Sequence, residues 1–242
     1  MTAATPPLVS ILVISYNTRA MTLECLKSVV AETTVPYELI VVDNASPDGS
    51  AAALAAAFPD IRLIASAENL GFAKGNNVAA REAKGRYILL LNPDTLVLEH
   101  AIDRLVAFAE RTPAAGIWGG RTLNGDRTLN PSSVFGALTL WSLFCRASGL
   151  ALIFKRSAFF NPEEMGDWDR GDEREVDVVQ GSFFLIRRDF WEALDGFDAS
   201  FVMYGEEADL CRRARLRGAR PRMTPEATIV HFHGASSRRA AR

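Results

Sequence analysis

Residues 8–17 read LVSILVISYN and residues 37–44 read YELIVVDN. Each stretch is a run of apolar, largely β-branched residues that ends abruptly in polar ones. A short continuous apolar run is typical of a strand that is buried on both faces. Residues 22–32, between the two runs, carry Leu and Val at helical spacing. The chain therefore begins as strand, helix, strand, the unit from which parallel sheets are built.

The same alternation continues to about residue 120. We expect helix 50–58, strand 61–65, helix 75–83, strand 87–91, helix 99–110 and strand 116–120. This order predicts an α/β fold, with a mostly parallel sheet covered by helices. Ligands of such sheets bind outside the carboxyl ends of the strands. Polar clusters stand at those ends: Tyr16-Asn17, Asp43-Asn44, Asn69 to Gly71 and Asn92 to Asp94. We expect these clusters to converge into one binding site.

The second half of the chain is less regular. Residues 121–177 show weak periodicity and are predicted to be variable loops with one apolar segment. After them we expect strand 178–186, helix 188–194, helix 209–217 and strand 227–233. Neither a repeat nor a linker is visible. We therefore expect one domain over residues 1–242, with a first half at about 8–120 and a second at about 121–237.

The apolar segment Val134–Phe154 is long enough to raise the question of a membrane span. Arg146 lies near its middle, among glycines and serines, and a central charge is costly in a bilayer. We expect either a helix packed on the core or a helix lying on a membrane surface, because Lys155 and Arg156 follow it. The packed helix is the favoured interpretation.

The net charge and the cysteine content exclude some classes of protein. A net charge of −2 and a pI near 6.0 over 242 residues give no indication of a nucleic-acid binder. The three cysteines are far apart and form no disulfide framework, which favours a reducing, cytoplasmic compartment. No signal peptide is recognisable in residues 1–14. We therefore expect a cytoplasmic protein. It could also bind peripherally to the inner face of the membrane.

Four clusters could carry chemistry, and each has a plain structural alternative. Asn92-Pro93-Asp94 could hold Mg²⁺ or Mn²⁺, or be a simple turn. Asp43 could bind a ribose or base, cap a helix or form an Asx turn. The segment 206–209 (EEAD) could supply a general base, or acids that stabilise a helix N-terminus. His231 and His233 alternate along a strand and could be ligands, or packed polar residues.

The order of these motifs resembles glycosyltransferase family 2, in its bacterial rhamnosyltransferase-like branch. The matching segments extend over residues 8–237: SYN at 15–17, VVDNAS at 41–46, ENLGFAKGNN at 68–77, LNPD at 91–94, QGSFFLIRR at 180–188, GFD at 196–198, FVMYGEEADL at 201–210 and HxxGxS at 231–236. The resemblance implies a GT-A fold, with a Rossmann-like, mostly parallel sheet flanked by helices and a smaller acceptor-side sheet.

The resemblance also implies a role for individual residues. The residues implied to bind the donor are Ser15, Tyr16, Asn17, Asp43, Asn69, Gly71, Asn76, Asn92 and Asp94. Asp94 and His231 would be the metal ligands, for Mg²⁺ or Mn²⁺. Glu207 would be the catalytic base with Glu206 beside it. Gln180, Gly181 and Asp209 would stand on the acceptor side, and Asp209 would orient Arg213 or the acceptor.

The function implied is an inverting, metal-dependent transfer of a sugar from a nucleoside diphosphate. dTDP-rhamnose or a UDP-sugar would be the donor, and a hydroxyl of a cell-surface glycan or polyprenyl-linked molecule the acceptor. Two departures keep an alternative open: Asn92 replaces the first acid of the family's DXD motif, and Glu207 replaces an Asp base, which moves the proton acceptor by about one bond length. The alternative is an inactive GT-A-like module that binds a nucleotide or glycan.

Overall fold

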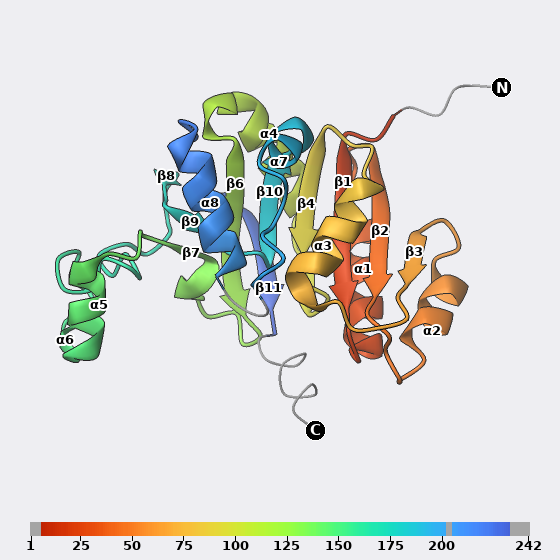
Figure 1. Ribbon diagram of the computed structural model, residues 1–242, viewed down its shortest axis with the longest axis horizontal. Helices are drawn as coiled ribbons and strands as arrows, with labels where there is room; N and C mark the ends of the chain where they lie inside the picture. Colours follow the sequence, from red (N-terminus) through yellow and green to blue (C-terminus); the bar gives the residue numbers. More distant parts are fainter. Residues whose placement is uncertain (1–5, 202–204, 233–242) are drawn as a thin grey trace.

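A nine-stranded sheet with helices on both faces organises the chain in a computed structural model that describes residues 6–201 and 205–232 (Figure 1). Its order is β3-β2-β1-β4-β10-β6-β11-β5, and β8 pairs with β11 at the side. The strands are β1 Val9–Ser15, β2 Tyr37–Asp43, β3 Arg62–Ala65, β4 Tyr87–Leu91, β5 Thr95–Val97, β6 Ile117–Asn124, β8 Arg174–Glu175, β10 Phe183–Arg187 and β11 Arg222–His231. A second sheet pairs β7 Val134–Phe135 with β9 Val178–Val179.

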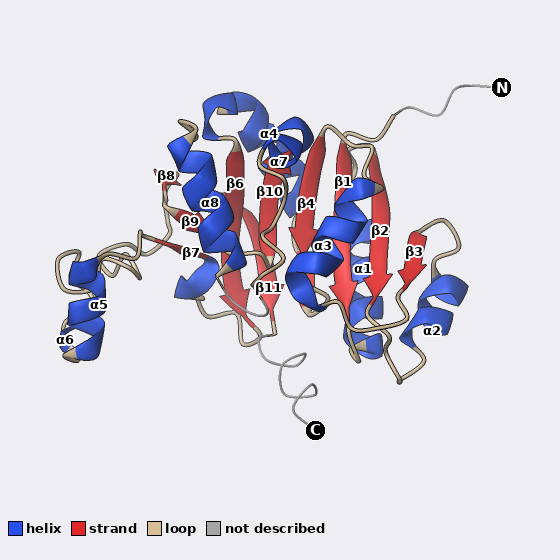
Figure 2. Cartoon of the chain, in the orientation of Figure 1, coloured by secondary structure: helices blue, strands red, loops and turns tan. Residues whose placement is uncertain are grey.

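The helices are α1 Arg19–Glu32, α2 Ser50–Ala57, α3 Gly71–Arg81, α4 Ala101–Arg111, α5 Leu140–Ala147, α6 Leu150–Ile153, α7 Arg188–Ala193 and α8 Glu206–Leu216. The helices other than α5 and α6 cover the two faces of the sheet (Figure 2). Val9, Ile11 and Val13 of β1 pack into one core with α1 and α4, whereas Leu12 and Ile14 pack into the other with α3 and α8. Because both faces are buried, the strand is apolar throughout.

The predicted parallel sheet is confirmed in the first half of the chain. β3, β2, β1 and β4 pair in parallel, so their carboxyl ends share one edge. Beyond β4 the sheet is mixed, because β10 runs antiparallel to both β4 and β6. The mostly parallel sheet flanked by helices and the smaller second sheet agree with the expectation from the sequence.

Several predicted elements have different bounds in the structure, and the predicted strand 227–233 begins earlier, at Arg222. The predicted strand 178–186 is wrong as one element, because the chain turns at residues 180–182 and leaves the small sheet for the large one. The predicted helices 75–83 and 209–217 begin earlier, at Gly71 and Glu206, so their first turns lie against the edge where the strands end. Residues 121–177 also hold strands and short helices rather than loops alone. His233 lies outside the described residues.

Helices α5 and α6 project from the body of the molecule (Figure 1). The prediction of a helix packed on the core is wrong for this segment, because α6 buries none of its side chains and α5 buries only Ser142 and Cys145. Within residues 6–201 and 205–232, the structure has no helix with the length and apolar character needed to cross a bilayer.

Candidate active site

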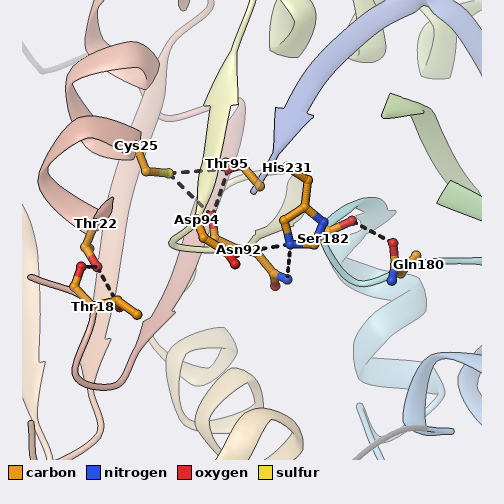
Figure 3. A network of polar contacts seen from close by, with 9 residues as sticks. All are labelled: Thr18, Thr22, Cys25, Asn92, Asp94, Thr95, Gln180, Ser182 and His231. Atoms are coloured by element: carbon orange, nitrogen blue, oxygen red, sulfur yellow. Dashed lines mark hydrogen bonds and ion pairs between the residues drawn. The ribbon is translucent and has the colours of Figure 1, made fainter. Parts of the chain in front are cut away.

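Asp94 and His231 meet at the carboxyl edge of the sheet although 137 positions separate them. Asp94 follows β4, and His231 ends β11, where it pairs in register with Thr95 of β5. The His231 Nε2 atom lies 3.1 Å from Asp94 Oδ1 and 3.3 Å from Asn92 Nδ2 (Figure 3). Both Asp94 and His231 are almost fully buried, so their contact is shielded from solvent.

The chemistry of this pair fits a divalent cation. Carboxylate oxygen and imidazole nitrogen are both ligands of Mn²⁺, and carboxylate oxygen is the ligand Mg²⁺ prefers. Two neighbouring ligands, each about 2.1 Å from an octahedral ion, would lie roughly 3.0 Å apart, which is close to the observed spacing. The described residues contain no group of three or more His, Cys, Asp or Glu that could complete a metal site. A bound substrate or water would supply further ligands.

Backbone contacts hold the loop 92–95 in place. The Thr95 hydroxyl donates to the Asn92 carbonyl at 2.8 Å, and the Phe232 N–H donates to the Asp94 carbonyl at 2.9 Å. The Cys25 thiol lies 3.5 Å from the same Asn92 carbonyl. Burial raises the pKa of Cys25 to about 12, so this thiol stays neutral and serves packing. Thr95 was not singled out by its sequence, because a lone threonine after a turn carries no distinctive signal.

Asp43 is a buried carboxylate with one oxygen available. Its Oδ2 accepts the Ser46 N–H at 3.1 Å, while Oδ1 is buried with no hydrogen-bond partner in the described chain. The start of α2 is held instead by Asp48, whose carboxylate accepts from both the N–H and the hydroxyl of Ser50. The helix-cap alternative for Asp43 is therefore not what the structure has. A buried acceptor without a donor costs about 1–3 kcal/mol, which suits a site that receives a ligand's N–H or O–H.

Asn44 repeats this pattern next to Asp43. Its Nδ2 donates to the Gly71 carbonyl at 3.2 Å, and its amide oxygen is buried without a partner among the described residues. Asn69, which is exposed, accepts the Gly71 N–H at 2.9 Å and so shapes the turn into α3. Asn76 is buried inside α3, where its Nδ2 donates to the Phe72 carbonyl. Asn69 and Gly71 thus lie at the strand edge beside Asn44. The donor-pocket roles of these residues stay predictions.

The loop after β1 is tied to the loop after β2. The Asn17 N–H donates to the Ser46 hydroxyl at 2.9 Å, and Asn17 adopts a left-handed backbone (φ 54°). Ser15 is fully buried, and its hydroxyl lies 3.2 Å and 3.0 Å from those of Thr18 and Thr22. Ser15 therefore fastens β1 to α1, whereas the half-buried Tyr16 lies nearer to solvent. The nucleoside-binding roles of residues 15–17 stay predictions.

Glu206 and Glu207 open helix α8. The Gly181 N–H donates to Glu207 Oε1 at 3.1 Å, and Glu206 Oε2 is buried with no hydrogen-bond partner among the described residues. Burial, followed by the negative charge of Glu206, raises the pKa of Glu207 to about 7. Burial also raises the pKa of Glu206. A carboxylate with a pKa near neutral can accept a proton efficiently at the pH of a cell.

Residues 180–182 connect Glu207 with the loop that carries Asn92 and Asp94. Gly181 holds Glu207, while the Ser182 carbonyl accepts the Asn92 N–H at 3.2 Å, and the Ser182 hydroxyl donates to Gln180 Oε1 (Figure 3). A Cβ atom at Gly181 would lie 2.8 Å from both Glu207 Oε1 and Phe72 Cζ. Glycine is therefore needed here for close approach, not for an unusual backbone angle. Phe72 was not named as a site residue by its sequence, because an aromatic in a helix usually signals core.

Asp209 forms an ion pair with Arg213 on the same helix. Its carboxylate accepts the Arg213 Nε–H at 2.7 Å, and the same guanidinium donates to the carbonyls of Leu194 and Gly196. This pair fixes α8 on the segment after α7, as the sequence indicated for Arg213. A groove of about 900 Å³ runs along the other side of α8, between Asp209 and residues 135–138.

The chain is similar in sequence to known glycosyltransferases. A family model for glycosyl transferase family 2 matches residues 10–194. The chain is 28% identical over 230 residues to the N-acetylglucosaminyl-diphospho-decaprenol L-rhamnosyltransferase of Mycobacterium tuberculosis, covering 88% of this chain and 72% of that protein. It is 27% identical over 172 residues to the rhamnosyltransferase WbbL of Escherichia coli, covering 67% of this chain and 61% of WbbL.

Solved structures show the fold. A Pyrobaculum calidifontis mannosyltransferase, in complex with GDP-Man and Mn²⁺, matches with a TM-score of 0.66 at 20% identity, over 98% of this chain. The structure of GalNAc-T7 with UDP, GalNAc and Mn²⁺ matches with a TM-score of 0.68 at 14% identity, over 96% of this chain. The chain spans 60% and 45% of those two proteins. Both are GT-A glycosyltransferases, so this chain has the GT-A fold.

Proposed function

The chain is a glycosyltransferase of family 2, and on that premise we propose that it transfers a sugar from a nucleoside diphosphate to a hydroxyl group by a metal-dependent, inverting reaction. One observation carries the proposal. The pair Asp94 and His231, proposed to bind the cation, and the carboxylate Glu207, with its pKa of about 7, are joined through residues 180–182. This arrangement supports a base facing a site for a charged leaving group.

Glu207 is the proposed general base. Its carboxylate would remove the proton from the acceptor hydroxyl as that oxygen attacks the anomeric carbon. The bond to the diphosphate breaks as the new glycosidic bond forms, so one displacement inverts the anomeric centre and no covalent intermediate is needed. The bond from the Gly181 N–H to Oε1 supports this role, because it fixes the carboxylate while leaving the other oxygen for the acceptor.

Asp94 and His231 are the proposed metal ligands, and Asn92 lies beside them as a donor-binding residue. When bound, Mg²⁺ or Mn²⁺ would neutralise the negative charge that develops on the leaving diphosphate. Asp43 and Asn44, with buried acceptor oxygens and no partners for them among the described residues, would take donor groups of the nucleoside. Ser15, Tyr16, Asn17, Asn69, Gly71 and Asn76 would shape the rest of this pocket.

For the donor we propose dTDP-rhamnose, with a UDP-sugar as the second candidate. The support is that two relatives, at 28% and 27% identity, are rhamnosyltransferases. For the acceptor we propose a polyprenyl-linked or cell-surface glycan, because the mycobacterial relative is named for a decaprenol-linked one. Gln180, Gly181 and the groove beside Asp209 would receive it. Such a substrate would place the reaction on the cytoplasmic face of the membrane.

The test is release of nucleoside diphosphate from a panel of dTDP-, UDP- and GDP-sugars, with Mn²⁺, Mg²⁺ or EDTA. We expect metal-dependent turnover of one donor. Asp94→Ala should lose it, and Glu207→Gln should lower kcat by about 10²–10⁴-fold while the donor still binds. Asn69→Ala, at an exposed residue, is the milder comparison within the same pocket.

The outcome for the whole panel decides between the enzyme and its alternative. Turnover that persists in EDTA or in Asp94→Ala would contradict the metal site. Binding of a nucleotide sugar without turnover of any donor, in the presence of a lipid-linked acceptor, would point to an inactive GT-A-like module.

A further inference from the structure

Exposed apolar side chains gather on one part of the molecule. Of the twelve large hydrophobic residues that are exposed in the described chain, nine lie between residues 138 and 159. We call residues 138–160, which contain α5 and α6, the apolar lobe. Leu140 is 87% exposed, and Leu152 and Ile153 are each 71% exposed. Contiguous exposed apolar surface of this kind marks a site of interaction with a partner or a membrane.

The apolar lobe is built to hold these side chains in place. Trp141 stacks on Phe144 with 5.5 Å between ring centroids, and its Nε1–H donates to the Phe159 carbonyl. The Thr139 side chain caps α5 through a capping box with Ser142. At the base of the lobe, the buried guanidinium of Arg170 donates to four backbone carbonyls in residues 131–168. The exposed apolar side chains are therefore held by a segment with its own hydrogen bonds and ring contacts.

The charge of the apolar lobe has one sign. No Asp or Glu occurs between Asp126 and Glu163. Arg146 pairs with Glu163, whereas Lys155 and Arg156 are exposed and pair with no carboxylate of the described chain. Apolar side chains with flanking cations are the combination that binds an anionic lipid surface, and Trp prefers the boundary between headgroups and acyl chains.

We propose that the apolar lobe inserts into the headgroup region of an anionic lipid bilayer. The groove beside α8 supports this assignment, because Leu138 at the start of the lobe forms one wall and Asp209 of α8 forms the other. A docked lobe would bring the mouth of this groove to the bilayer surface, where a lipid-linked acceptor lies. The choice of acceptor rests on the proposed function, but bilayer binding does not.

Co-sedimentation of the full chain with vesicles tests the proposal. We expect the chain to bind vesicles of phosphatidylglycerol mixed with phosphatidylcholine, and to bind phosphatidylcholine alone less well. The double variant Leu152→Ser/Ile153→Ser should lower the partition coefficient roughly tenfold or more. Lys155→Ser/Arg156→Ser should lower it by about fivefold for each cation removed, and only on the anionic vesicles. Val30→Ser, an exposed site on α1, is the matched control and should bind as the wild type does.

Tryptophan fluorescence gives a second, independent measurement. Trp118, Trp168 and Trp191 are buried, and Trp141 on the apolar lobe is 38% exposed. A blue shift on addition of anionic vesicles should therefore come from Trp141, and Trp141→Phe should abolish it. Brominated acyl chains should quench the emission of the wild type if the lobe reaches the hydrocarbon boundary.

Several results would overturn the proposal. Failure of the wild type to bind anionic vesicles would do so, as would equal binding by the lobe variants. A wild type that is dimeric in solution, with lobe variants that are monomeric and no vesicle binding, would assign the surface to a second copy of this chain. Donor hydrolysis measured without vesicles separates failure of bilayer binding from failure of the proposed function. The lobe variants should retain this hydrolysis, whereas their transfer of sugar to a vesicle-borne acceptor should fall.

Discussion

Glu207 must lose its proton before it can act as a base, and burial beside Glu206 raises its pKa to about 7. We therefore expect kcat/KM to rise about tenfold per pH unit below pH 7 and to level off above it. The measurement is kcat/KM for donor turnover across roughly pH 5 to 9 with the metal held saturating. A profile that stays flat down to pH 5 would exclude Glu207 as the titrating base.

The same raised pKa predicts how stability depends on pH. The folded state binds the Glu207 proton more tightly than the unfolded chain does, because in the unfolded chain the pKa of this carboxyl is near its ordinary value of 4.5. The stability that this proton contributes is complete below pH 4.5 and is lost as the pH rises through about 7. A Gln at this position is always neutral, so Glu207→Gln should be inactive yet more stable than the wild type at pH 8, by about 2 kcal/mol.

Urea unfolding at pH 8 and near pH 4.5 measures this difference, which should shrink at the lower pH. Glu24→Gln, at an exposed position on α1, is the control and should change the unfolding free energy by less than about 0.5 kcal/mol. A Glu207→Gln variant that is destabilised at both pH values would mean that the carboxylate stabilises the fold.

At the scale of elements, the position of α8 depends on one guanidinium. Arg213 bonds Asp209 within the helix and the carbonyls of Leu194 and Gly196 outside it. Arg213→Ala leaves a carboxylate and two carbonyls without their donor, so we expect the unfolding free energy to fall by about 2 kcal/mol. For a chain of this length that corresponds to a Tm lower by roughly 4–8 °C.

Arg212 gives the matched comparison for this prediction. It is the neighbouring residue on α8 and is exposed, so Arg212→Ala should change Tm by no more than about 2 °C. Because Glu207 begins the same helix, Arg213→Ala should also lower kcat, and Arg213→Lys should restore part of the loss. Equal melting temperatures for the two alanine variants would show that the Arg213 contacts do not hold α8.

At the scale of the whole molecule, a bound nucleotide should stabilise the fold in a metal-dependent way. Asp43 ends β2 and Asn44 follows it, Asp94 follows β4, and His231 ends β11. A ligand that touches all of them would tie the two halves of the sheet together. A nucleoside diphosphate at a hundred times its Kd should add about 2.7 kcal/mol, which raises Tm by roughly 5–10 °C.

A thermal shift with Mn²⁺ and with EDTA measures this effect. We expect the larger shift only when metal and nucleotide are both present, and we expect Asp94→Ala to lose the metal-dependent part. An unchanged shift in EDTA would contradict metal-bridged binding by Asp94 and His231.

The sequence by itself determined the α/β fold, the order of its first elements and the edge at which polar residues gather. These features follow from short-range patterns: an apolar run such as residues 8–14 must be buried on both faces, and the polar residues after it must leave the sheet. The family, and with it the Asp94, His231 and Glu207 candidates, followed from the spacing of motifs. The role of Asp43 could not be decided this way, because an aspartate after a strand can bind a ligand, cap a helix or form an Asx turn.

The tertiary structure decided what depends on contacts distant in the chain. The break at residues 180–182 arises because β9 pairs with β7 and β10 with β4, and an apolar stretch does not encode its partner. The meeting of Asp94 with His231, and the raised pKa of Glu207, likewise need elements that only folding brings together. The same holds for the apolar lobe: its sequence resembles a core helix, and only the packing of the rest of the chain leaves it without a core to cover.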